Sequence, residues 1–330
     1  MSAIRVLQDY TFTAERETIY GQENDTAPVG LPTENLEFTL EPNKHRLNRA
    51  WGFRGFHSAN SWNDTFNVVP TAQSKILITP QILHLLLPGL LQSKPDWTAT
   101  ADVWTMKANN YAQLPGVKTA NEGYFFDLAR RFQDGTGELM KGAVVNSLKL
   151  SVSPTDDEGI LSGEFQFIGS AIDRNFSATG TVTHAPLTNM YRWGNLSQVS
   201  YNNNPLLSDF ISCELNITNG AKFAQDLTSS EIVFPKWEVT GTIKVVANAY
   251  TEAMKNDCLL KDVNMAVPIK IVFGNSNPSA EGDLAITVNA YLTGYKPDYT
   301  EGEVIEFTFE GVFGNSVSPV EFKFFYDTTP

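Results

Sequence analysis

The chain contains one pattern that occurs twice in the same order. Each copy has a Val-Asn pair, a proline, a glutamate and then a strand-like block that starts with Glu-Phe and ends with glycine. The matched positions are Val145-Asn146, Pro154, Glu158 and Glu164–Gly169 in the first copy, and Val288-Asn289, Pro297, Glu301 and Glu306–Gly311 in the second. The copies are about 140 residues apart, far more than the ~20–50 residues of a solenoid repeat. We therefore predict a duplicated domain, with Val145 equivalent to Val288 and Phe165 equivalent to Phe307.

The length of 330 residues is compatible with two domains. We predict an N-terminal arm over residues 1–35, a first domain over 36–187 and a second domain over 188–330. The first domain has a longer interval between its helix and its repeated block, which places an insertion at about 93–135. The arm is rich in charged residues and prolines, so it is either an irregular terminus or a segment that orders on a neighbouring subunit.

Strand signals dominate the sequence, because apolar and polar residues mostly alternate with the period of a half-buried strand. The clearest runs are Leu36–Leu40, Leu148–Val152, Glu164–Ile168, Cys213–Ile217, Thr242–Val246, Ile269–Phe273 and Glu321–Tyr326. Two helices are also expected. Thr79 and Pro80 have the pattern of an N-cap followed by proline at the first helical position, and the second helix covers Thr251–Leu260. The unit of strand, helix and long hairpin thus occurs twice in a mainly antiparallel β fold.

Charge and hydropathy exclude several classes of protein. The net charge of −13 argues against nucleic-acid binding, which needs clustered Lys and Arg to neutralise phosphates. The N-terminus has no apolar signal-peptide core. The most apolar stretch, residues 82–91, is too short to span a bilayer. We therefore expect a protein that is made in a cytosol and has no membrane segment, and whose two cysteines, Cys213 and Cys258, are free.

Residues that could carry chemistry do not form a recognisable motif. The histidines lack the spacing of a helical zinc site, and Asp156-Asp157-Glu158 lacks the alternating ligands of a calcium loop, so we interpret this cluster as a hairpin tip. Phosphate, dinucleotide and nucleophile motifs are missing from the sequence. We assign no catalytic, cofactor-binding or metal residue, and we expect neither a cofactor nor an enzyme. The four histidines are His45, His57, His84 and His184.

One alternative function remains open at this point. A pair of carboxylates for glycan hydrolysis is assembled in space and leaves no sequence motif. A cluster of aromatic residues is either a sugar-binding platform or a large apolar contact. The cluster consists of Trp51, Phe53, Phe56, Trp62 and Phe66. The alternative is therefore a two-sandwich carbohydrate-binding or glycan-hydrolysing protein.

Several blocks resemble the tail tube (major tail) proteins of long-tailed, non-contractile bacteriophages. They are Gly142–Ser153 leading to Gly163–Gly169, Ala290–Pro297 followed by Glu306–Gly314, and Tyr20–Glu23 before Leu31–Leu36. The similarity covers nearly the whole chain in order, and the insertion at 93–135 departs from it. The resemblance implies two tandem β-sandwich domains, each flanked by a helix. It also implies a structural virion protein whose stacked rings form the conduit for genome ejection.

The resemblance further implies a set of partners. Members with two such domains form homotrimeric rings of pseudo-sixfold symmetry, and heterologous contacts stack such rings into a tube. The tape measure protein and DNA pass through the lumen without specific binding, while tail-terminator and tail-tip proteins lie at the ends. A negative lumen wall suits this role because it repels phosphate. We expect assembly in the host cytoplasm and localisation in the virion tail; a tail terminator or a baseplate hub protein is a third possibility.

Overall fold

The structure is a computed structural model of the chain. It describes residues 10–17, 23–33, 36–44, 65–91, 96–98, 102–108, 125–184, 186, 189–225, 230–233, 237–260, 266–298, 303–312 and 318–327. Strands dominate these residues, and two α-helices accompany them: α1 (Pro80–Leu91) and α2 (Ala249–Leu260). The mainly β fold predicted from the alternating pattern is confirmed.

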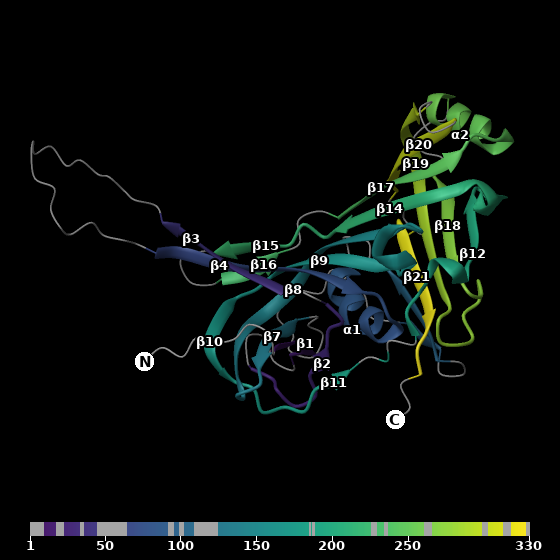
Figure 1. The fold of residues 1–330 in the computed structure, drawn as a ribbon. Coiled ribbons are helices and arrows are strands. Elements are labelled where there is room, and N and C mark those ends of the chain that lie inside the picture. Colours follow the sequence, from purple (N-terminus) through teal and green to yellow (C-terminus); the bar gives the residue numbers. More distant parts are fainter. Residues whose placement is uncertain are drawn as a thin grey trace, which may run out of the picture.

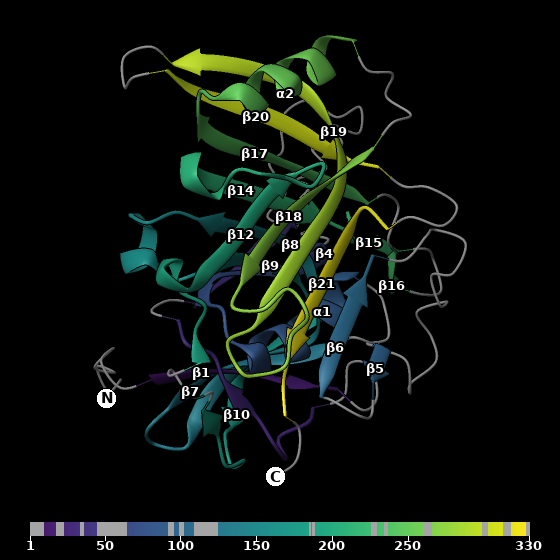
Figure 2. The same ribbon diagram turned by 90° about the vertical axis from the view of Figure 1, so that its right-hand side faces the viewer.

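A continuous run of eight antiparallel strands organises the fold (Figure 1). Neighbours pair in the order β3-β4-β9-β8-β14-β17-β20-β19. The bounds are β3 Leu36–Lys44, β4 Thr65–Leu77, β9 Ser162–Ile168, β8 Thr136–Val152, β14 Phe210–Thr218, β17 Glu238–Val246, β20 Val304–Gly311 and β19 Leu284–Asp298. In Figure 2, β20, β17 and β14 follow one another downward from α2. We call these strands the central sheet.

The long strands β8 and β19 leave the central sheet at their N-terminal ends and enter two further sheets. There β8 lies between β7 and β10, and β1, β2 and β11 extend the sheet beyond β7. Similarly, β19 lies between β18 and β21, with β12 and β13 beyond β18, and β6 and β5 beyond β21. The bounds are β1 Tyr10–Arg16, β2 Val29–Gly30, β5 Asp96–Thr98, β6 Val103–Lys107, β7 Phe126–Phe132, β10 Ala171–Ser177, β11 Thr183–His184, β12 Leu196–Tyr201, β13 Asn204–Pro205, β18 Val267–Phe273 and β21 Val320–Phe325. A separate hairpin, β15 (Lys222–Gln225) and β16 (Ser230–Val233), projects on the same side of the body as β3 and β4 (Figure 1).

The central sheet consists of two arrays with the same strand order. The first array is β3-β4-β9-β8 and the second is β14-β17-β20-β19. Each has a bulge at the same place, between Val145 and Ser147 in β8 and between Leu292 and Gly294 in β19. The agreement extends beyond the central sheet. In the first half β7 and β10 pair with β8, and β1 pairs with β7; in the second half β18 and β21 pair with β19, and β12 pairs with β18.

The strand pairings correct one predicted equivalence. Phe165 and Phe307 are equivalent, as predicted. Phe165 pairs with Leu148 and Phe307 pairs with Tyr295, and each partner is the second residue after the bulge in its strand. Val145, however, corresponds to Leu292, four residues beyond Val288. The physical reason is the period of a strand: a shift of four residues keeps every side chain on its original face, so two short apolar-polar blocks align almost equally well in both registers.

Helix α1 begins as its sequence predicts and is held by a contact from β1. The Thr79 hydroxyl accepts a hydrogen bond from the Ile82 N–H at 3.3 Å. Pro88 lies inside the helix and has no N–H, so the carbonyl of His84 loses its helical donor. Arg16 replaces that donor: its guanidinium Nη2 donates to the carbonyl of His84 and, at 3.3 Å, to that of Leu85. Burial, with a contribution from Arg16, lowers the pKa of His84 to about 4.

Helix α2 starts two residues before the predicted position. Asn248 is the N-cap, since its side-chain oxygen accepts hydrogen bonds from the N–H groups of Tyr250 at 2.8 Å and Thr251 at 2.9 Å. The Thr251 hydroxyl accepts a reciprocal bond from the Asn248 N–H at 2.9 Å, which completes a capping box. Neither α1 nor α2 is long and apolar enough to cross a membrane, and no other helix in the described ranges is.

Two expectations about irregular segments were wrong in part. Residues 10–16, within the expected irregular arm, form β1, which pairs with β7 over its whole length. The strand β7 lies within the expected insertion 93–135, yet it occupies the place of β18 in the second half. Both strands bury polar side chains, among them Glu15 and Asp127, and these interrupt the apolar alternation that marks a strand. Among the described residues within 93–135, β5 and β6 are the strands without a counterpart in the second half.

Candidate assembly interface

The two arrays meet where β14 pairs with β8, and we call this pairing the internal joint. Leu215 lies opposite Leu150, and Asn216 lies opposite Lys149. One face of the joint is apolar and buried; its side chains are Leu148, Leu150, Val152, Cys213, Leu215 and Ile217. The burial of both rows against the core stabilises the joint by the hydrophobic effect, at about 25 cal/mol per Å² of apolar surface. The two halves of the chain therefore share one core.

The other face of the central sheet is polar. Lys149 and Glu214 form an ion pair across the internal joint at 3.0 Å, and Lys244 and Glu306 form another farther along at 3.1 Å. The residues of this face alternate with the buried ones, so its charged side chains reach solvent. They are Glu37, Lys75, Glu164, Lys149, Glu214, Glu238, Lys244, Glu306, Glu310, Lys296 and Asp298. Acidic residues outnumber lysines in this row.

Asn219 fastens the internal joint from inside the core. Its side chain is fully buried and its amide donates to the carbonyls of Val145 at 2.7 Å and Leu90 at 3.2 Å. Its side-chain oxygen accepts from the Ala221 N–H at 3.0 Å. One residue therefore links the end of β14 to β8 and to the last turn of α1.

We expect Asn219→Ala to lower the free energy of unfolding by about 2–4 kcal/mol, because two buried carbonyls lose their donor. Chemical denaturation of the subunit measures this loss. The matched control is Asn216→Ala on the same strand, whose amide makes only a 3.4 Å contact with Glu214; we expect a change within about 0.5 kcal/mol. Equal losses in the two variants would contradict the fastening role of Asn219.

Two strand edges of the central sheet have no partner among the described residues. The edge strand β3 pairs with β4 alone, and the C-terminal half of β19 pairs with β20 alone. The corresponding strands, β14 and β8, are each paired on both sides. The missing neighbouring strand raises the exposure of side chains near the edge. Tyr295 on β19 is 39% exposed, whereas Leu148 at the same position of β8 is 1% exposed. Unpaired edges of this length are sites where another chain can add a strand.

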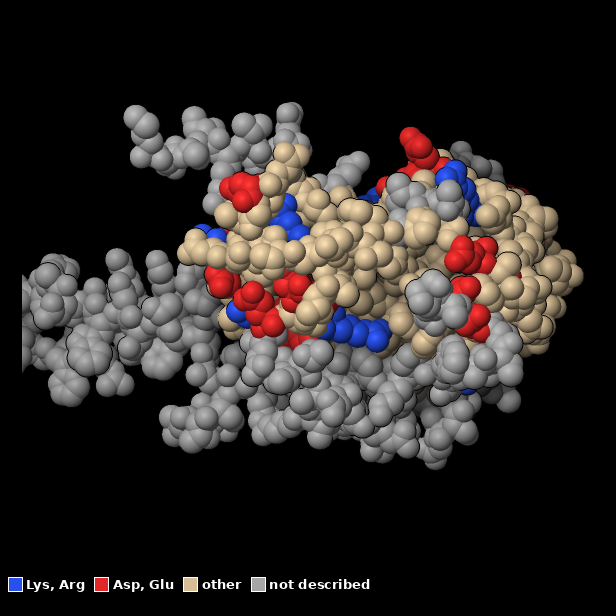
Figure 3. Space-filling model, turned by 90° about the horizontal axis from the view of Figure 1, so that it is seen from below, with Lys and Arg blue, Asp and Glu red and all other residues tan. Residues whose placement is uncertain are grey.

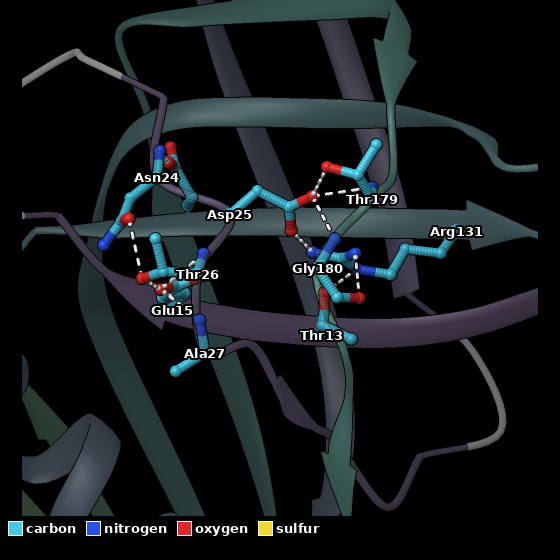
Figure 4. Close-up of polar contacts among 10 residues, drawn as sticks. Thr13, Glu15, Asn24, Asp25, Thr26, Ala27, Arg131, Thr179 and Gly180 are labelled. Atoms are coloured by element: carbon cyan, nitrogen blue, oxygen red, sulfur yellow. Dashed lines mark hydrogen bonds and ion pairs between the residues drawn. The ribbon is translucent and has the colours of Figure 1, made fainter.

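A buried ion pair holds the segment between β1 and β2 (Figure 4). The carboxylate of Asp25 bonds the Arg131 guanidinium and accepts hydrogen bonds from the N–H groups of Thr179 at 2.8 Å and Gly180 at 2.7 Å. Arg131 also donates to the Thr13 hydroxyl at 2.9 Å. Burial raises the pKa of Asp25, but the bonds from Arg131, Gly180 and Thr179 outweigh it and leave the pKa below its usual value.

Three more carboxylates, those of Glu15, Glu17 and Asp127, are buried beside this segment. Glu15 lies opposite Asp127 in the β1–β7 pairing and accepts hydrogen bonds from Thr26 and from the Ala27 N–H, the latter at 2.8 Å. Asp127 accepts from the Asn24 N–H at 2.6 Å. Burial raises the pKa of Asp127 to about 6, and Glu15 adds to the rise, while Glu17, Asn24 and Lys141 oppose it.

This raised pKa predicts a dependence of stability on pH. Because the folded pKa of Asp127 exceeds the unfolded value of about 3.9, its contribution is full below pH ~4 and is lost as pH rises through about 6. We expect Asp127→Asn to reduce the stability difference between pH 5 and pH 8 by about 1–2 kcal/mol. Denaturation of both proteins at the two pH values measures this. An unchanged difference would show that Asp127 does not titrate in this range.

The described residues among those considered from the sequence belong to different elements of the fold. His84 packs edge-on against Trp104 with ring centres 4.2 Å apart, and His184 lies in β11. Asp157 bonds Lys75 at 2.7 Å and the Ser162 hydroxyl, closing the hairpin between β8 and β9. Phe66 belongs to β4. The other two histidines and four aromatic residues, His45, His57, Trp51, Phe53, Phe56 and Trp62, lie outside the described residues.

The described residues contain no group of three or more His, Cys, Asp or Glu side chains placed to hold a metal ion. Cys213 and Cys258 are free, as predicted, although Cys258 is only half-buried. Sequence reasoning missed Asn219, Asp25 and Arg131. Asn219-Gly220 directly after an alternating run was the one available signal, since it marks the end of a strand.

Comparison with known proteins agrees with this architecture. No curated protein matches the chain. The model of the phage tail tube protein family matches residues 65–312, which include the internal joint, both helices and most of each array. The chain therefore belongs to the phage tail tube protein family, and it is a structural protein of the virion tail that self-assembles into a tube.

Proposed function

We propose that this protein forms the tube of a long, non-contractile tail from rings of three chains, and that the tube conducts the genome during ejection. The observation that carries the proposal is the repeated strand order of the central sheet. Each chain supplies two arrays of the same topology, so three chains supply six equivalent units around one axis. The chain is thus a duplicated tube domain, with one β-sandwich unit and one helix in each half.

The polar face of the central sheet is the face we assign to the lumen. Its opposite face packs on the core, so this face is the one that remains accessible when arrays join edge to edge. Its acidic residues outnumber its lysines, and a negative wall repels the phosphates of passing DNA. On the side seen from below, the described acidic and basic side chains lie in small groups among uncharged residues (Figure 3). The tape measure protein and DNA then pass without specific binding, and terminator and tip proteins close the ends.

Assembly takes place in the host cytoplasm in this proposal, before the tail joins the virion. Native mass spectrometry of isolated rings tests the stoichiometry: we expect three times the 36.5 kDa of the subunit. Negative-stain electron microscopy of the purified protein tests the tube itself. A ring of six chains would overturn the trimer and leave the tube intact, whereas a protein that forms neither rings nor tubes would contradict the function.

A further inference from the structure

The edge strand β3 takes the same position in the first array as β14 takes in the second. Leu36 pairs with Ser74, and Ser74 pairs with Phe165. Cys213 pairs with Ile243, and Ile243 pairs with Phe307. Because Phe165 and Phe307 are equivalent, Leu36 corresponds to Cys213, and the following residues correspond one by one.

The sequences of the two strands agree in this alignment. Leu36-Glu37-Phe38-Thr39-Leu40 and Cys213-Glu214-Leu215-Asn216-Ile217 both have apolar residues at the odd positions of the segment, glutamate second and an uncharged polar residue fourth. In β14 this pattern occurs in a strand that is paired on both sides, with β17 and with β8, and its apolar side chains are buried. The same pattern in β3 suits a strand with a neighbour on its second side.

The half-paired end of β19 is the matching edge. By the same alignment Tyr295 corresponds to Leu148, and Lys296 corresponds to Lys149. Lys149 forms its 3.0 Å ion pair with Glu214, which corresponds to Glu37. Tyr295 is one of few large apolar side chains that are exposed among the described residues, and it lies where an added strand would cover it.

We infer that β3 of one chain adds antiparallel to β19 of the next, with Thr39 opposite Lys296 and Leu40 opposite Tyr295. This register repeats the internal joint, where Asn216 lies opposite Lys149 and Ile217 opposite Leu148. It places Glu37 beside Lys296, as Glu214 is placed beside Lys149. The inference rests on the proposed ring and names its contact: the central sheet continues from chain to chain until it closes, which removes both unpaired edges.

Disulfide trapping tests this register. The variant Thr39→Cys/Lys296→Cys, made with Cys258→Ser in the full chain, places two cysteines at directly opposed positions, where Cα atoms are about 4.5–5.5 Å apart and a disulfide can form. Mild oxidation of assembled protein should convert most chains into covalent dimers and trimers on a non-reducing denaturing gel. The matched control is Glu41→Cys/Lys296→Cys. It uses the same face two residues away, where the separation of about 7–8 Å is too long.

The outcomes separate the inference from the proposed function. Rings that form normally but cross-link at the control pair as well as at the test pair would overturn the register. Rings without any cross-link between chains would overturn the use of these two edges, and the tube function would stand. The inference is supported if the test variant forms covalent dimers and trimers on oxidation, the control variant does not, and variants with a single introduced cysteine form no trimer.

Discussion

Replacing Phe165 with alanine should lower the free energy of unfolding by about 3–5 kcal/mol, and Phe307→Ala should cost a similar amount. Both side chains are fully buried and occupy the same position of the two arrays. Each change removes a large apolar side chain and leaves a cavity that the surrounding strands fill only in part. Denaturant unfolding of the isolated subunits measures both losses.

The control for this pair is Gln166→Ala. Gln166 is adjacent to Phe165 on β9 but points to the exposed polar face, so we expect a change of about 0.5 kcal/mol or less. A large loss for one phenylalanine and a small loss for the other would mean that equivalence in strand pairing does not extend to packing.

The second large effect is expected at the buried ion pair. Asp25→Ala should destabilise the subunit by about 3–5 kcal/mol, because Arg131 then remains buried without its counterion. Arg131 and Asp25 side chains are 7% and 9% exposed. The pKa of Asp25 is depressed in the folded state, so its stabilisation is present above the unfolded pKa of about 3.9 and is lost as pH falls through the folded value. The cost of the substitution should therefore shrink at low pH.

Glu23→Ala provides the comparison for Asp25→Ala. Glu23 belongs to the same segment and forms an ion pair with Lys141 at 3.0 Å, but its side chain is 40% exposed. Solvent screens such a pair, and we expect a loss of at most about 1 kcal/mol. If Glu23→Ala and Asp25→Ala cost the same, burial is not what makes the Asp25 pair important.

Sequence patterns predicted the parts of this fold that local chemistry determines. The alternation in Leu148–Val152 and Cys213–Ile217 marked strands because one face of each is buried and the other is not. Thr79 and Pro80 marked the start of α1 for the same kind of local reason. The resemblance to tail tube proteins, confirmed by the family match, added the function.

Features that depend on distant partners were beyond the reach of the sequence. β1 and β7 bury Glu15 and Asp127, and hydrogen bonds from residues 24–27, which are distant in sequence from Asp127, stabilise these carboxylates. The alignment of the β8 sequence with the β19 sequence was ambiguous, because a shift of four residues keeps every side chain on the same face of the strand. The internal joint pairs β8 with β14, which are separated by residues 153–209, and no local pattern encodes which two edges meet.

The pairing of β6 with β21 has a mechanical consequence. β6 follows α1 in the first half of the chain, yet it extends the sheet of the second half. The stretch between Leu260 and Val267, after α2, is too short to supply such a strand to a neighbour. In the proposed ring of three chains, two strand pairings, β8 with β14 and β6 with β21, would connect the halves of one chain, and the inferred pairing of β3 with β19 would connect neighbouring chains. Stiffness would then alternate around the circumference, and a tail that bends would yield first along the three seams between chains.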